Sequence, residues 1–145
     1  MKILKIIFVF FLLMNTNCKK DDDDTKTALE QLPQATQTGA QTFGCLIDGK
    51  PFIPDSFGSG RPSAFYQFVG GSYTLGISAT KKSNQSQTVL ISALDVEKII
   101  ENNYLLISYQ SGNLSGRYLL SGGIDLSVST TDKNSGTLTI TNFDE

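Results

Sequence analysis

Apolar and polar residues alternate along most of the chain after residue 42, and this period of two predicts β-strands. In residues 72–79 every second side chain is apolar, from Tyr73 to Ala79, and small polar residues occupy the other face. Such a strand is buried on one face only, as in an antiparallel sheet. Residues 88–94 carry apolar side chains on both faces, so this strand is expected to be central or covered.

Short turn sequences separate the expected strands. Asp48-Gly49 lies between the apolar segments 43–47 and 50–53, and it predicts a two-residue hairpin turn because both positions favour positive φ. Pro51 cannot donate a ladder hydrogen bond, so the second arm is expected to be very short or at a sheet edge. Further strands are expected at residues 64–69, 104–110, 116–120, 124–130 and 137–141.

Residues 95–103 fit two structures. Val96, Ile99 and Ile100 have helical spacing, so a short helical turn between strands is one alternative.

The pattern as a whole predicts an all-β domain over residues 43–145, an antiparallel β-sandwich or barrel-like domain of about eight strands with one short helix as an option. The last strand, 137–141, leaves an open edge unless it is paired on both sides.

The N-terminus has a different pattern. Lys2 and Lys5 precede nine consecutive apolar residues, 6–14, which is the length of a secretory signal and too short for a membrane span of about 20 residues. The run ends just before Cys18. This arrangement resembles a bacterial lipoprotein signal, which implies that residues 1–17 are removed and that Cys18 carries lipid on its sulfur and amino group. A free or disulfide-bonded Cys18 behind ordinary cleavage is the alternative.

A charged run follows the cysteine. It resembles the tag that directs Bacteroidota lipoproteins to the outer face of the outer membrane, and it consists of Lys19, Lys20, Asp21, Asp22, Asp23 and Asp24. The alternative is that these charges only keep a stalk solvated. Residues 18–42 hold few apolar side chains and are therefore expected to form a disordered acidic tether.

The balance of acidic and basic residues excludes some classes of binding partner. The chain has 12 basic and 14 acidic side chains, and removal of Lys2 and Lys5 with the signal leaves 10 basic against 14 acidic, a net charge of −4. This balance argues against nucleic acid as a partner. It also argues against purely electrostatic binding to anionic lipid.

Few residues are candidates for chemistry. The chain has no histidine, which removes Ser-His and Cys-His catalysis and the commonest metal ligand, and no cofactor or metal site is predicted. Cys45 is expected to be a buried small apolar residue, with a reactive thiol as the alternative. Asp95 and Glu97 are the carboxylates considered for a hydrolase. Residues 132–136 are expected to form a hairpin turn and not a calcium loop. Phe57, between Ser56 and Gly58, is the candidate ligand contact.

Two segments resemble a family of uncharacterised Bacteroidota lipoproteins. Thr38-Gly39, residues 42–45 and Gly49-Lys50 match a "TGxxTFGCxxxGKxF" motif, and residues 136–144 match a "GTLTITxFD" strand. The family has no established activity, so the resemblance implies no catalytic residue. Its members often continue into one more strand, so a terminal strand is expected to be missing here or supplied otherwise.

The function expected from these patterns is a lipid-anchored outer-membrane lipoprotein, displayed on the cell exterior, that acts as a binding or accessory module and not as an enzyme. A glycan, a peptide or an envelope protein is the expected partner, besides the membrane itself. Two alternatives stay open: a carboxylate-dependent hydrolase of the cell envelope, and a structural subunit that pairs through its C-terminal edge strand.

Overall fold

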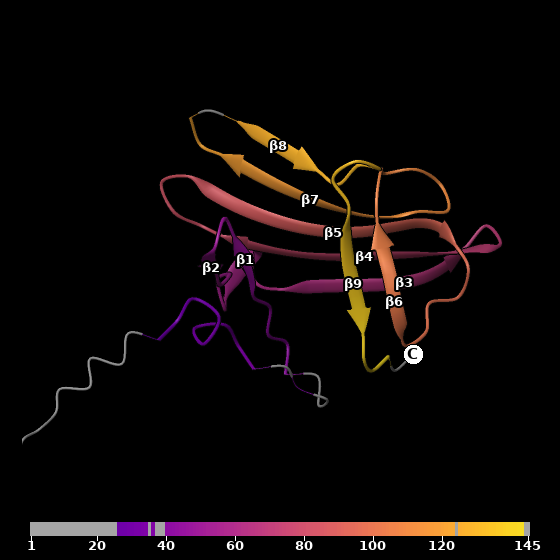
Figure 1. Cartoon of the computed structure of the whole chain (residues 1–145), viewed down its shortest axis with the longest axis horizontal. Helices are drawn as coiled ribbons and strands as arrows, with labels where there is room; N and C mark the ends of the chain where they lie inside the picture. The colour runs from indigo at the N-terminus through magenta and orange to yellow at the C-terminus, as the bar shows by residue number, and fades with distance from the viewer. Residues whose placement is uncertain (1–25, 35, 37–39, 124, 144–145) are drawn as a thin grey trace, which may run out of the picture.

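The computed structural model describes residues 26–34, 36, 40–123 and 125–143, and it confirms the predicted all-β class (Figure 1). A small sheet holds two strands and the main sheet holds seven. The elements in chain order are β1 (Cys45–Ile47), β2 (Lys50–Phe52), the 3-10 turn η1 (Gly58–Gly60), β3 (Ser63–Val69), β4 (Ser72–Lys81), β5 (Ser86–Val96), β6 (Asn102–Leu106), β7 (Leu114–Ser121), β8 (Leu126–Ser129) and β9 (Gly136–Ile140).

The expected hairpin is formed by β1 and β2. Asp48 and Gly49 connect the two strands with φ values of 49° and 74°, as the Asp-Gly turn requires. Strand β2 has only three residues, in agreement with the limit that Pro51 sets. Phe52 ends this strand with 1% of its surface exposed, and its ring meets that of Phe43 edge-on at 6.0 Å.

The main sheet has the order β3-β4-β5-β7-β6-β9, with β8 also paired to β7. Strand β5 lies between β4 and β7, which confirms that the segment with apolar residues on both faces is central. One edge of β7 pairs with β5, and its other edge pairs with two strands, β6 and β8. Leu114 at its beginning pairs in parallel with Leu106 of β6, and residues 117–120 pair with β8.

The strand pair β6–β9 crosses the long strands β3, β4 and β5, which gives the domain a sandwich-like second layer (Figure 1). The core lies between these layers. Its buried side chains are Leu75, Ala93, Val96, Ile99, Leu106 and Leu114. From β9, Leu138 and Ile140 pack against this cluster, and Thr137, Thr139 and Thr141 are exposed, as the alternation predicted.

The helical alternative for residues 95–103 is wrong. Strand β5 extends to Val96 through an irregularity in its pairing with β4, where Asp95 has a φ of 53°, and no helix follows. Tyrosine hydroxyls accept hydrogen bonds from the loop backbone: Tyr66 from Ile99 N–H at 2.9 Å, and Tyr104 from Ile100 N–H at 2.8 Å. These bonds satisfy the loop amides without a helix and let Ile99 enter the core.

The turn expected at residues 132–136 is present, but it does not join a hairpin. Thr131 N–H donates to the carbonyl of Asn134, and Asn134 N–H donates to the Thr131 hydroxyl, both at 3.0 Å. Strand β8 before the turn pairs with β7, and β9 after it pairs with β6. The turn therefore carries the chain from one layer to the other.

Residues 26–34 form a defined turn within the stretch that the sequence assigned to the tether. Thr27 and Glu30 bond reciprocally as in a capping box, with the Thr27 N–H donating to the Glu30 carboxylate at 2.7 Å. These bonds from Thr27 hold the pKa of Glu30 below its ordinary value. Pro33 packs so closely on Gly44 that a Cβ there would lie 2.6 Å from the proline ring. The turn therefore packs on the segment that leads into β1.

One hydroxyl connects the two layers. Thr130 Oγ1 accepts a hydrogen bond from Gly116 N–H of β7 at 2.9 Å and donates to the Ile107 carbonyl, just after β6, at 2.6 Å. A Cβ added to Gly116 or to Gly136 would lie 3.4–3.9 Å from Leu106 and the Thr130 methyl, at ordinary contact distance, so both glycines lie beside these two side chains. Thr130 therefore fixes the place where β6 leaves the plane of β7.

We predict that Thr130→Val lowers the free energy of unfolding by about 2 kcal/mol, because Gly116 N–H and the Ile107 carbonyl lose a partner in a part-buried place. Urea denaturation followed by circular dichroism measures this loss. The matched control is Thr137→Val, at an exposed position of β9, where a change of less than about 0.5 kcal/mol is expected. Equal effects of the two substitutions would contradict the role given to Thr130.

Candidate functional site

The loop between β2 and β3 is fixed to the end of β4 by three hydrogen bonds. Asp55 N–H donates to the Thr80 carbonyl at 3.0 Å, and the Asp55 carboxylate accepts from Lys82 N–H at 3.2 Å. The Lys82 ammonium donates to the Ser59 hydroxyl at 2.6 Å. A Cβ on Gly60 would lie 2.6 Å from the Asp55 carboxylate and 2.7 Å from the Thr80 carbonyl, so the loop requires glycine there.

Phe57 lies in this braced loop with 88% of its surface exposed, which agrees with its selection from the sequence as an exposed aromatic. It lines a groove of about 490 Å³ together with Phe43, Ile53 and Arg61. The same groove is also lined by Pro33 and residues 40–42, which the sequence assigns to the tether. Arg61 carried no signal in the sequence, because the composition of a loop does not indicate which of its residues will line a groove.

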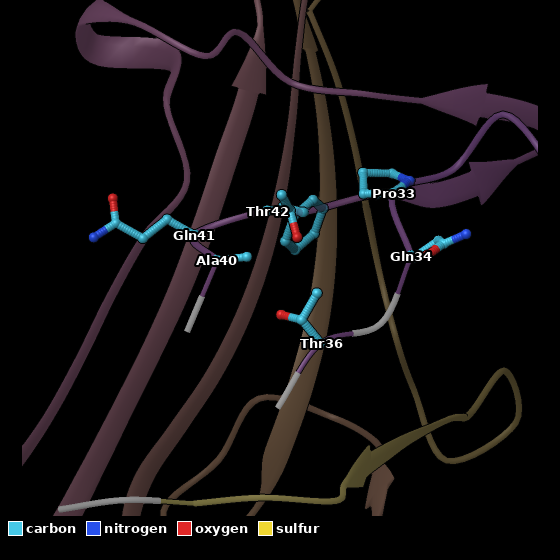
Figure 2. Close-up of a pocket in the computed structure, with 8 residues that line it drawn as sticks. Pro33, Gln34, Thr36, Ala40, Gln41 and Thr42 are labelled. Atoms are coloured by element: carbon cyan, nitrogen blue, oxygen red, sulfur yellow. The ribbon is translucent and has the colours of Figure 1, made fainter. Parts of the chain in front are cut away.

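A second hollow of about 440 Å³ lies beside the first and shares five lining residues with it, Pro33, Ala40, Gln41, Thr42 and Phe43. Figure 2 shows Thr36, Ala40 and Thr42 pointing into this hollow, with Gln34 and Gln41 extending to either side. We treat the two adjoining hollows as one groove, which is lined by the turn-bearing segment and by the loop from Ile53 to Pro62. Its walls mix aromatic, hydroxyl and amide groups, which suits contact with a surface or an extended ligand.

Asp95, one of the two carboxylates considered for hydrolysis, is already bonded within the fold. Its oxygens accept hydrogen bonds from the Ser72 hydroxyl at 2.9 Å and from the Ser111 hydroxyl at 3.1 Å. Ser72 begins β4 and Ser111 lies in the loop before β7, so the carboxylate connects three segments at the irregularity of β5. These hydrogen bonds give Asp95 a structural role. They do not place it as a partner of Glu97, the other carboxylate considered for hydrolysis.

Cys45 is a free thiol, half-buried on β1 directly opposite Phe52. Burial raises the pKa of this thiol above its ordinary value, so the reactive thiolate is disfavoured at neutral pH. Among the described residues, no group of three or more carboxylate or cysteine side chains is arranged to hold a metal ion. Nor does any helix in the described part of the chain have the length and apolar character to cross a membrane.

Strand β9 has a single sheet neighbour, β6, in the described structure, so the expected edge is confirmed. Its sequence, GTLTI, has neither a charge nor a proline, the residues that commonly block pairing at an edge. In Figure 1 its free edge faces the side of the domain that holds the β1–β2 hairpin. Its backbone groups on that edge are available to a further strand.

An apolar strip lies on the same face of the main sheet as the core but beyond its buried cluster. We define it as Val89 of β5, Tyr118 of β7 and Val128 of β8, which are directly paired across the three strands. Val89 and Tyr118 are half-buried, and Val128 is 53% exposed. The adjoining row, Gly116 and Ile91, lies at the core under the β6–β9 layer. The strip is therefore the next row of the sheet beyond that layer.

The proposed lipid site and export tag, Cys18 and residues 19–24, lie outside the described residues, so they stay predictions. Comparison with known proteins gave no match: no family model, no curated protein and no solved structure is similar to this chain.

Proposed function

We propose that this protein is a lipid-anchored binding module of the outer membrane, held by acylated Cys18 and displayed on the cell exterior. The apolar run that ends before Cys18 and the lysine and aspartate tag after it support this placement. Two or more acyl chains hold a protein firmly on a membrane, whereas one chain binds only marginally.

The observations that carry the binding role are the uncharged free edge of β9 and the apolar strip, which lies one row beyond the row covered by the β6–β9 layer. An extended peptide segment that pairs with β9 would satisfy the backbone groups of this edge. Alternate side chains of that segment would point toward the sheet and cover Val89, Tyr118 and Val128. An envelope protein or peptide with an alternating apolar segment is the partner that fits both features, and it fits them better than a glycan, which cannot continue the backbone ladder.

The placement of the anchor is tested with intact cells that produce the wild-type chain, Cys18→Ser, or a variant with Asp21 to Asp24 changed to alanine. Metabolic labelling with an alkyne fatty acid is expected to mark the wild type and not Cys18→Ser. External protease is expected to remove the wild-type domain and to spare the domain of the aspartate variant. An unlabelled wild type excludes the anchor, and equal protection of wild type and variant excludes the tag.

The binding role is tested with a photo-crosslinking amino acid in place of Val128, on the apolar strip. Ultraviolet light on living cells is expected to give one discrete protein adduct, and Thr137→Lys on β9 is expected to abolish it because a lysine obstructs pairing at the edge. The matched control is Gln67→Lys, an exposed position on the opposite edge strand β3, which is expected to leave the adduct intact. An adduct that survives Thr137→Lys would show that the edge is not the binding site.

A further inference from the structure

Phe57 is held away from the domain by a loop that is itself fixed. Its exposed fraction of 88% is the highest among the large apolar side chains of the described residues. Hydrogen bonds hold the loop to the end of β4 on both sides of Phe57, at Asp55 and at Ser59. Exposure of a whole aromatic ring on a braced loop is unfavourable in water, and it is typical of a contact surface.

This ring lies at the place where the chain comes from its anchor. Pro33 packs on Gly44 and lines the same groove as Phe57. The turn that contains Pro33 begins near Lys26, and eight residue steps separate Lys26 from Cys18. Eight fully extended residues span at most about 28 Å. The groove therefore lies within a short reach of any membrane that holds Cys18.

The side chains around Phe57 have the composition of a membrane-contacting surface. Ile53, which lines the groove with Phe57, is 41% exposed, and Leu46 of β1 is 43% exposed. The hairpin, the loop and the end of β4 hold four basic residues, Lys50, Arg61, Lys81 and Lys82, against two acidic residues, Asp48 and Asp55. One of those acids, Asp55, already accepts a backbone N–H. The net charge of this end is positive, although the chain as a whole is negative.

We propose that the loop from Ile53 to Pro62 docks on the membrane that carries Cys18, with Phe57 inserted at the boundary between headgroups and acyl chains. This inference rests on the proposed lipid anchor. Aromatic side chains favour that boundary, and lysine and arginine extend their charged ends to lipid phosphates while their stems stay in apolar surroundings. A short tether gives the loop an effective concentration on the order of millimolar at the surface, so a weak contact is well populated.

Docking at this loop fixes the orientation of the domain. The β6–β9 layer crosses the long strands away from the hairpin end, as Figure 1 shows. A domain that rests on the groove would therefore hold the β6–β9 layer at a distance from the lipid, with the free edge of β9 facing the hairpin side across that distance. The two contacts, acyl chains and Phe57, would together present the strand-binding edge to a partner.

The absence of tryptophan from the chain allows a single reporter. Full-length Phe57→Trp, acylated in the producing cells, is reconstituted into phosphatidylcholine vesicles whose acyl chains carry bromine, which quenches tryptophan on contact. We expect blue-shifted emission and loss of most of its intensity relative to vesicles without bromine. The matched control is Tyr109→Trp, 52% exposed in the loop before β7, which the Leu94–Ser111 bridge places at the opposite end of β5. Its emission is expected to stay unquenched.

Mass spectrometry of the same reconstituted protein separates the two proposals. Acylated protein with an unquenched Phe57→Trp reporter overturns the docking and leaves the anchor intact, and it returns Phe57 to the role of ligand contact. Protein without acyl groups on Cys18 overturns the anchor and the docking together. Equal quenching of the two reporters overturns the specific orientation. Both positions are exposed, so neither substitution is expected to disturb folding.

Discussion

The arrangement of this domain depends on the pairing of one edge of β7 with two different strands, β6 and β8. One strand edge cannot pair with two neighbours at the same position, so β6 pairs with β7 only at Leu106 and Leu114, and β8 pairs with residues 117–120. The β6–β9 pair then turns out of the sheet plane and covers part of one face. The Thr130 hydroxyl stabilises this departure, since it joins the backbones that separate there. The core, the free edge of β9 and the apolar strip all follow from that division.

The division also separates two surfaces. The part of the sheet face under the β6–β9 layer holds the core. The next row runs from the buried Ala79 through its partner Val89 into the apolar strip, which is more exposed toward Val128. A fold in which β6 continued the sheet in plane would have neither this strip nor an edge above it. The proposed partner strand would complete the second layer.

The sequence predicted the local structure well because local chemistry determines it. Asp48-Gly49 adopts the positive φ values that its residue types favour, and the strict alternation from residue 72 to residue 79 leaves a single face to bury. Residues 95–103 fit two structures because the fold of this segment depends on a hydroxyl far along the chain, that of Tyr66. The pairing of one β7 edge with both β6 and β8 and the packing of Pro33 on Gly44 are likewise long-range contacts. No local periodicity in the sequence indicates them. Phe57 was recognised from its small polar neighbours, whereas Arg61 and residues 40–42 joined its groove only through the fold.

Residue-resolved amide hydrogen exchange on the purified full-length chain tests the central claim most directly. With β6 as the only neighbour of β9, we expect alternate amides of β9, those directed at β6, to be protected, and the amides between them to exchange at rates close to those of unpaired backbone. Protection of every amide of β9 in a monomeric sample would contradict the account, because it would mean that the edge is already occupied within the chain.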